Sequence, residues 1–219
     1  MELLFDHSLG KQEQQDLVIC RPMAIVEHDE EEEALDGGWL ALDHPVADRE
    51  VFYQSRSTRI NLDLYRPRYK RHEYNGQDIG IKVIDASEMV KLLGLPHIYS
   101  QYMERKNFGV DYDPFTHYHP RDQFMIFYLG TADNIVGFTK QKKYRYPEEN
   151  YSTIDSYDSK DLAGIESVIH ANTIPISDIT LDLEIDWAQN NYVAYFYMGS
   201  GYETSSEYKA NYRGFCLLY

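Results

Sequence analysis

A β-hairpin near the middle of this 219-residue chain is the sequence feature that most constrains its fold. Two apolar runs, Phe124–Leu129 and Ile135–Thr139, flank the connection Gly130–Asn134. Short strand-forming runs joined by a glycine-containing connection of this length are typical of neighbouring antiparallel strands. Two more short apolar runs, 79–84 and 193–198, lie before and after the hairpin. We therefore predict a sheet that contains antiparallel neighbours.

Helix signals fill the segment between the first of these runs and the hairpin. Residues 86–93 predict a helix that ends at Gly94, and a second helix is expected after Pro96. Nearer the N-terminus, the acidic segment 27–36 predicts a short helix ended by two glycines, because Glu and Ala favour helix and glycine terminates it.

The remaining segments give weaker signals. Residues 17–26 form an apolar run broken by a proline, which predicts an edge strand or two short strands. Residues 51–64 alternate between apolar and polar, which predicts one half-buried strand that stops at Arg66-Pro67. Residues 147–164 predict a loop or weak helix, and residues 166–174 predict a strand.

Residues 178–190 carry two competing patterns. Apolar and acidic residues alternate from Ile179 to Trp187, which is a strand pattern by period. Yet Ile179, Leu183 and Trp187 are spaced by four, and Asp178 suits a helix N-terminus. Periodicity alone favours the strand.

The composition excludes several classes of protein. Cys20 and Cys216 are the two cysteines of the chain, too few for a disulfide framework or a cysteine zinc site. The first twenty residues have no basic start and no continuous apolar stretch, unlike a signal peptide. No window approaches the length of a membrane span. The sequence therefore predicts a cytoplasmic protein without a membrane partner.

Charge is segregated along the chain. The formal net charge is −15, yet residues 56–72 hold six basic residues against Asp63 alone, and residues 140–146 hold four basic residues and no acid. Such segregation is typical of a localised phosphate-binding face in an acidic protein. Solvated strand edges are the alternative, because Lys and Arg also protect exposed edges from aggregation.

The tyrosine content and one group of histidines and aspartates also bear on function. Twenty tyrosines suit either stacking on bases and pocket walls or the filling of a tyrosine-rich core. His117 and His119 have Asp111, Asp113 and Asp122 nearby, but no third metal ligand is fixed by spacing. We predict no metal site.

A resemblance to a known family rests on segments that follow one another over residues 34–213: Leu35–Trp39, Val51–Ile60, Arg66–Arg71, Tyr99–Arg105, Ile179–Ala188, Tyr195–Gly199 and Tyr208–Arg213. In this order they resemble the arginyl- and leucyl-tRNA–protein transferases, which belong to the GNAT acyltransferase superfamily. The order of strand, helices, hairpin, strand, further element and glycine-ended strand is also that of the GNAT fold.

This resemblance implies a fold and an activity. The expected fold is α/β, a GNAT-like mixed, mostly antiparallel sheet flanked by helices. A small N-terminal subdomain is expected over residues 1–75 and the acyltransferase domain over residues 76–219. The resemblance also favours helix for residues 178–190. The implied activity moves an amino acid from aminoacyl-tRNA to the amino group of a protein or peptide, without a cofactor.

An aminoacyl ester is already activated, so such an enzyme must mainly hold ester and amine together and stabilise an oxyanion. The resemblance and this chemistry together give the candidate site residues. These are Arg59, Arg68 and Arg71 as phosphate anchors, Tyr208 and Lys209 for ester positioning or proton transfer, Glu184 for orienting the amine, Tyr202 for lining the pocket, and Gly199 and Gly201 where the strand admits the donor.

We expect Tyr208, Glu184 and Arg59 to share one pocket. A structural hydrogen bond between helix and strand is the alternative role for Glu184 and Tyr208.

Two other functions remain open. An acetyl-CoA-dependent GNAT N-acetyltransferase would need a glycine-rich turn whose N–H groups bind pyrophosphate, and the corresponding turn here is Thr173–Asp178, with a proline and an acid. The third possibility is a catalytically decayed GNAT-like module kept for protein interaction.

Overall fold

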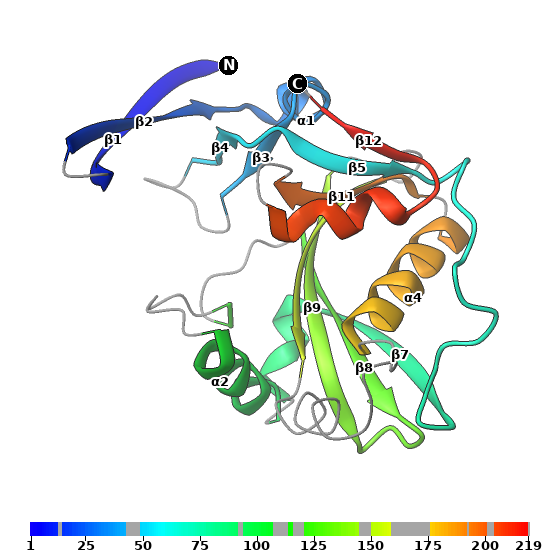
Figure 1. Cartoon of the computed structure of the whole chain (residues 1–219). Coiled ribbons are helices and arrows are strands. Elements are labelled where there is room, and N and C mark those ends of the chain that lie inside the picture. Colours follow the sequence, from blue (N-terminus) through cyan, green and yellow to red (C-terminus); the bar gives the residue numbers. More distant parts are fainter. Residues whose placement is uncertain are drawn as a thin grey trace.

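Two β-sheets make up most of the computed structural model (Figure 1). It describes residues 1–12, 15–42, 49–91, 94–106, 114–115, 121–144, 150–158, 176–191, 193–200 and 204–218. The smaller sheet has the order β1-β2-β4-β3, and the larger has the order β12-β5-β11-β10-β9-β8-β7-β6. All neighbours are antiparallel except β10 and β11. The predicted class, a mixed α/β fold with a mostly antiparallel sheet flanked by helices, is confirmed.

The N-terminal quarter of the chain builds the smaller sheet. Its strands are β1 Glu2–Gln12, β2 Gln15–Ile25, β3 Trp39–Ala41 and β4 Val51–Gln54. The 3-10 helix η1 (His28–Glu30) and helix α1 (Glu31–Asp36) confirm the acidic helix. Gly38, with φ of +80°, turns the chain after α1. The apolar side of α1 packs on Ala24 and Phe52 in a fully buried cluster.

The two sequence predictions for this region need correction. Residues 17–26 do not form an edge strand, because β1, which has no clear strand pattern, pairs along the whole of β2. Residues 51–64 are not one strand, because Arg56 adopts a positive φ and the chain then leaves the smaller sheet. The expected boundary at residue 75 stays a prediction.

The larger sheet contains the hairpin. Its strands are β5 Ser57–Asn61, β6 Glu73–Tyr74, β7 Gln77–Asp85, β8 Asp122–Leu129, β9 Ile135–Tyr144, β10 Asn150–Asp158, β11 Val193–Ser200 and β12 Phe215–Leu217. The β8–β9 hairpin is confirmed. The loop or weak helix predicted for 147–164 is wrong for β10, where pairing with β9 along its length overrides a polar sequence. The strand predicted for 166–174 lies outside the described residues.

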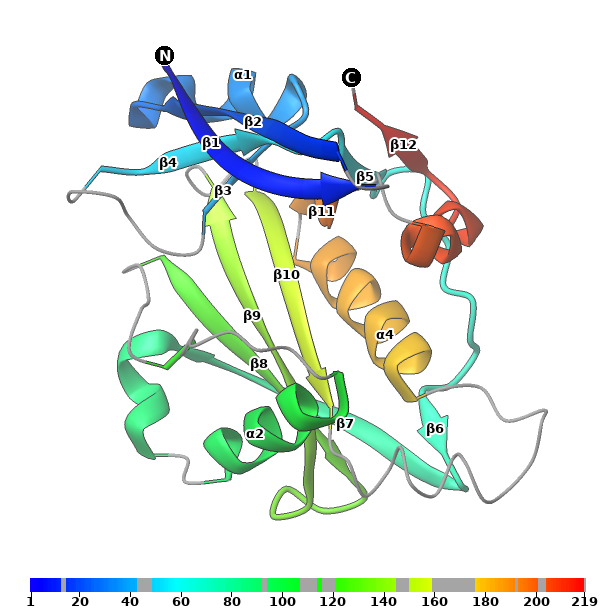
Figure 2. The same cartoon turned by 60° about the vertical axis from the view of Figure 1, so that its left-hand side comes forward.

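Helices cover both faces of the β8–β9 hairpin (Figure 2). The 3-10 helix η2 (Ala86–Lys91) and helix α2 (Leu95–Lys106) occupy the two segments predicted to be helical. α2 packs on Phe124 and Phe138, whereas helix α4 (Ile176–Asn190) packs on Met125 and Phe127 from the opposite face.

Helix α4 resolves the two competing patterns in favour of helix, as the resemblance implied. Asp182 and Glu184 are fully buried, so the alternation of apolar and acidic residues is not an inside–outside pattern.

The parallel strands β10 and β11 stay paired for only part of their length. They pair from Asn150 and Val193 to Thr153 and Tyr197. Beyond that point β10 continues beside β9, and β11 continues beside β5. The strands therefore diverge (Figure 1), and α4 connects them because it lies between them in the chain.

An ionic cluster joins the smaller sheet to the larger one. Arg121 donates to Glu31 at 2.6 and 2.8 Å and to Glu50 at 3.1 and 3.2 Å, and Lys142 donates to Glu50 at 2.8 Å. Lys140 is buried beside Asp122 at 3.4 Å. Lys140 and Lys142 are therefore neither an anion-binding face nor an exposed edge, because β9 lies inside the sheet and both ammonium groups are paired internally.

We expect Arg121→Ala to lower the free energy of unfolding by about 2–4 kcal/mol, because it leaves two largely buried carboxylates without their shared cation. Arg49→Ala is the control, since Arg49 forms long contacts to exposed Glu2 and Glu27 and such pairs contribute about 0–1 kcal/mol. Urea unfolding at neutral pH measures both. Equal losses in the two variants would contradict a joining role for Arg121.

Candidate functional site

A buried carboxylate on α4 holds the segment between β5 and β6, residues 62–72, which we call the basic loop. Asp182 is 0% exposed and accepts hydrogen bonds from the Tyr65 hydroxyl at 2.5 Å, the Arg68 amide at 3.0 Å and the Tyr69 amide at 3.2 Å. His72 Nε2 lies 3.1 Å from the same carboxylate. Four residues of the loop are thus fixed to one side chain.

These bonds decide the ionisation of Asp182. Burial by itself raises the pKa of a carboxyl group. The hydrogen bonds from His72, Tyr65 and the two amides outweigh burial, so the pKa of Asp182 lies below its ordinary value. The carboxylate is therefore charged at neutral pH, although it is fully buried.

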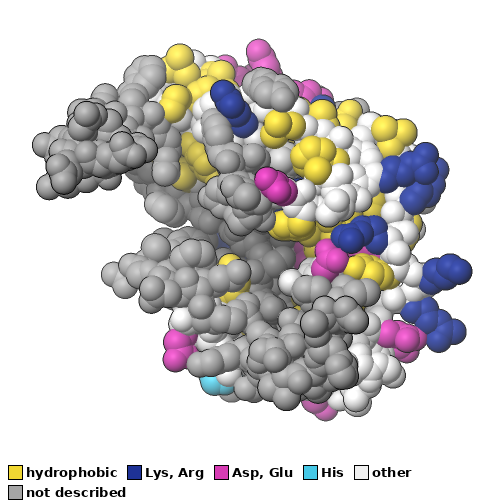
Figure 3. Space-filling view, viewed as in Figure 1, with side chains coloured by type: hydrophobic (Ala, Val, Ile, Leu, Met, Phe, Trp, Pro, Cys, Tyr) yellow, Lys and Arg dark blue, Asp and Glu magenta, His cyan; other side chains and the backbone are white. Residues whose placement is uncertain are grey.

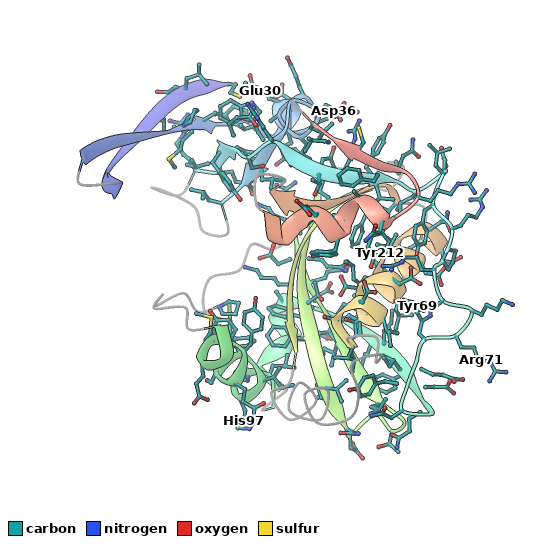
Figure 4. All side chains as sticks on the ribbon, in the orientation of Figure 1. Glu30, Asp36, Tyr69, Arg71, His97 and Tyr212 are labelled. Atoms are coloured by element: carbon teal, nitrogen blue, oxygen red, sulfur yellow. The ribbon has the colours of Figure 1, made fainter. Side chains whose placement is uncertain are left out.

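One helical turn earlier, Asp178 binds the loop a second time. It accepts from the Arg68 guanidinium at 2.9 Å, the Tyr69 hydroxyl at 2.7 Å and the Tyr212 hydroxyl at 3.2 Å. The guanidinium also lies 4.8 Å from the centre of the Tyr212 ring, within cation–π range. Burial and the bond to Asp178 raise the pKa of Tyr69 to about 12. Tyr69 and Tyr212 lie beside α4 in Figure 4.

The other cations of the basic loop face solvent. Arg66, Lys70 and Arg71 are exposed, and Arg71 projects away from the molecule in Figure 4. Dark blue side chains gather along the right-hand edge of the face shown in Figure 3, where the segment after β5 runs. Arg71 contacts Glu73 at 3.2 Å, but its side chain is 80% exposed.

A second group of polar residues surrounds the point where β10 and β11 diverge. Glu184 is 0% exposed on α4, and its carboxylate accepts a hydrogen bond of 2.7 Å from the Thr139 hydroxyl of β9. Tyr208 lies on the 3-10 helix η3 (Thr204–Asn211). Partial burial raises the pKa of Tyr208, and so do the negative charges of Glu184 and Asp178. The charges of both acids therefore act on the Tyr208 hydroxyl, although 46% of the residue is exposed.

Lys209 and Gly199 complete this group. Lys209 is 7% exposed, and its Nζ lies 3.9 Å from the place that a Cβ atom on Gly199 would occupy. Gly199 has φ of +79°, a conformation that favours glycine. The Thr58 hydroxyl donates to the Gly199 carbonyl oxygen at 3.0 Å. The end of β11 therefore lies between β5 and the Lys209 ammonium.

Arg59 belongs to a different surface. It pairs across strands with Tyr197, so the two side chains share one face of the sheet. Its guanidinium contacts Asp36 and lies 4.0 Å from the centre of the Tyr195 ring. The neighbouring residue Ile60 packs on the opposite face, in the cluster that contains α4. The structure therefore does not bring Arg59 together with Glu184.

The candidate residues thus fall into separate places. Glu184 of α4, Tyr208 and Lys209 of η3 and Gly199 of β11 form the set that we call the divergence site: the charge of Glu184 acts on Tyr208, and Lys209 lies beside Gly199. Arg68 pairs with Asp178, and the Arg71 side chain is 80% exposed. Gly201 and Tyr202 lie outside the described residues.

Sequence reasoning missed the roles of Asp178 and Asp182. The available signal was two acids four residues apart, on one helical face, in a chain with a strongly basic segment.

Across the described residues, no group of three or more His, Cys, Asp or Glu side chains is placed to hold a metal ion. The helices within the same ranges are too short or too polar to cross a bilayer. Among the histidines and aspartates around His117 and His119, Asp122 lies within the described residues, and it pairs with Lys140.

No protein-family model and no curated protein matches the sequence. Among solved structures, the C-terminal domain (DUF2156) of a putative lysylphosphatidylglycerol synthetase from Agrobacterium fabrum is similar at a TM-score of 0.47 and 11% identity, over 80% of this chain and 53% of that chain. L-PGS from Bacillus licheniformis is similar at 0.45 and 14%, over 81% and 54%. This chain thus spans about half the length of those two chains.

An aminoglycoside acetyltransferase from an uncultured soil metagenomic sample, solved with sisomicin, is similar at a TM-score of 0.37 and 12% identity, over 61% of this chain and 83% of that chain. Likenesses at these scores carry no argument about activity.

The lowered pKa of Asp182 predicts a pH-dependent contribution to stability. A carboxylate whose pKa is depressed by folding stabilises the protein above its unfolded-state pKa, ordinarily 3.8, and that contribution is lost as pH falls through the lower folded-state pKa. We expect Asp182→Asn to cost about 2–3 kcal/mol at neutral pH, because hydrogen bonds to a charged acceptor are weakened.

The cost should shrink as pH falls from 3.8 through the lower folded-state pKa, below which the wild-type carboxyl is also neutral. Chemical unfolding at several pH values measures it. Asp133→Asn in the exposed β8–β9 connection is the control, with an expected change of about 0.5 kcal/mol or less, as for surface positions. A cost for Asp182→Asn that is independent of pH would contradict the assignment.

Proposed function

We propose that this protein is an acyltransferase that moves an amino acid from aminoacyl-tRNA to the amino group of a protein or peptide. The observation that carries the proposal is the divergence site, where α4 supplies a buried carboxylate and η3 supplies a tyrosine hydroxyl and a buried ammonium, the ammonium lying beside Gly199 near the end of β11. Strand divergence at this position is where the resemblance to GNAT enzymes expects the acyl donor to enter.

The charges of the divergence site suit an amine acceptor and an ester donor. Glu184 is a buried carboxylate, and a buried negative charge favours a ligand that is a cation or a hydrogen-bond donor. It orients the incoming amine and accepts its proton. Lys209 supplies a buried ammonium that stabilises negative charge on the ester carbonyl oxygen. Tyr208 keeps its proton through neutral pH, because its pKa is raised, and serves as a hydrogen-bond donor.

The proposed reaction uses no external oxidant or cofactor. The amine nitrogen attacks the ester carbonyl carbon, and the electron pair of the carbonyl moves to its oxygen beside Lys209. The tetrahedral intermediate then collapses, which forms the amide and breaks the bond to the ribose oxygen of the tRNA. Glu184 receives a proton from the nitrogen, and Tyr208 donates a proton to the departing ribose oxygen and regains it from Glu184 through the shared site.

The donor preference rests on the start of α4. Asp178 lies in the first turn of this helix, and its carboxylate is partly exposed. A pyrophosphate group at the helix N-terminus would meet that negative charge, which disfavours acetyl-CoA as donor. The exposed cations of the basic loop favour a long polyanion instead. Acetyl-CoA is the second candidate donor.

A donor comparison tests the proposal. The protein is incubated with a mixed pool of tRNA carrying radiolabelled amino acids and, separately, with labelled acetyl-CoA, each with a peptide library that has free N-termini. Label in peptide from the charged tRNA supports the proposal. Label from acetyl-CoA alone replaces it with acetyl transfer, and binding of neither donor replaces it with a protein-interaction role.

Two substitutions test the assigned residues. We expect Tyr208→Phe and Glu184→Gln each to slow transfer by about 10- to 1000-fold, since one positioned proton donor or acceptor contributes a few kcal/mol in the transition state. Tyr128→Phe on β8 is the control, with unchanged transfer. Rates are taken per folded protein at saturating donor. A lower melting temperature with full activity in the remaining folded Tyr208→Phe protein would assign Tyr208 a structural role.

A further inference from the structure

The basic loop has two kinds of cation, and the structure separates them. Arg68, whose side chain is 31% exposed, is paired with Asp178 at 2.9 Å, and it anchors the loop to α4. Arg66 donates to main-chain carbonyl oxygens of Tyr65 and Asp63 within its own loop. Within the described ranges neither Arg66 nor Lys70 pairs with an acid, and Arg71 has an exposed pair that contributes little.

We propose that Arg66, Lys70 and Arg71 form the surface that binds the phosphate backbone of an RNA, and that buried Asp182 is the residue that positions this surface. The proposal deepens the proposed function, on which it rests for the identity of the RNA as a tRNA donor. It assigns the phosphate contacts to outward residues in place of Arg59 and Arg68, whose guanidinium groups are engaged with Asp36 and Asp178.

The positioning role follows from what Asp182 binds. The amides of Arg68 and Tyr69 both donate to its carboxylate, so the backbone between Arg66 and Lys70 is fixed to helix α4. Pro67 restricts the same stretch further because its φ is fixed by the ring. A loop held in one conformation loses less conformational entropy when it binds a partner, so its cations bind more tightly than the same cations on a loose segment.

Charge alone predicts that Asp182→Asn binds RNA more tightly, which is the opposite of what the positioning role predicts. Asp182→Asn removes a negative charge that contacts the loop carrying the three cations, and Coulomb attraction to a polyanion should therefore increase. If Asp182 positions the loop, the same substitution should weaken binding because the cations are no longer held together. The direction of the change separates the two effects.

Binding of deacylated tRNA, followed by fluorescence anisotropy between about 50 and 200 mM salt, tests the proposal without any transfer reaction. We expect the double variant Arg66→Ala/Lys70→Ala to bind more weakly and to lower the slope of log K against log salt by about 2, close to one per lost phosphate contact. The matched control Arg49→Ala/Lys82→Ala removes two exposed cations elsewhere and should keep nearly the full slope.

We expect Asp182→Asn to weaken binding by about tenfold, as lost preorganisation does, at a temperature where circular dichroism shows it folded. Should Asp182→Asn fail to fold, Tyr65→Phe and His72→Leu give the same test. Each removes one bond to the carboxylate without removing an acid, and each should weaken binding to a smaller extent.

Three results would overturn the inference: equal or tighter binding by folded Asp182→Asn, an unchanged salt slope in the Arg66/Lys70 variant, or no tRNA binding by the wild type at low salt. Wild-type binding with the expected losses, but without amino-acid transfer, would support the inference and remove the proposed function. Transfer with binding unaffected by the loop variants would remove the inference alone.

Discussion

The carboxylate of Asp182 is the contact on which the arrangement of this protein most depends. It is fully buried in the middle of α4, yet it is ionised, because four groups from the basic loop donate to it or lie within hydrogen-bond distance of it. One side chain thereby fixes the exit from β5, the approach to β6 and the helix that connects the two diverging strands. Without the carboxylate, those amides and the Tyr65 hydroxyl would be buried without their acceptor.

Other buried acids of this chain are also held by partners from distant segments. Glu31 and Glu50 share Arg121 at the junction of the sheets, and Asp122 lies beside buried Lys140. A net charge of −15 thus gives a poor picture of the interior, where acids and bases are paired across distant segments. Arg66, Lys70 and Arg71 remain exposed within one loop, which explains how an acidic protein can present a local cationic surface.

Sequence patterns predicted the elements that local rules govern. The β8–β9 hairpin, the acidic helix α1 and helix α2 each follow from turn residues and propensities near in sequence. β10 was missed because its pairing with β9 and β11, not its composition, makes it a strand. At the candidate site, the roles of Glu184 and Tyr208 stay predictions, and the pairing of Arg59 with Asp36 depends on contacts between distant segments that no spacing rule reveals.

Strand β5 has a consequence for how the protein is made. Its neighbours in the larger sheet are β11 and β12, so residues 57–61 gain a strand partner only after residues 193–200 and 215–217 have been made. Leu218 also packs into the core of the smaller sheet, beside Phe52. During synthesis, the N-terminal quarter therefore emerges before Leu218 can complete its core and before β5 has a partner. Closure of the larger sheet is a late, long-range event, the kind of step that makes folding slow.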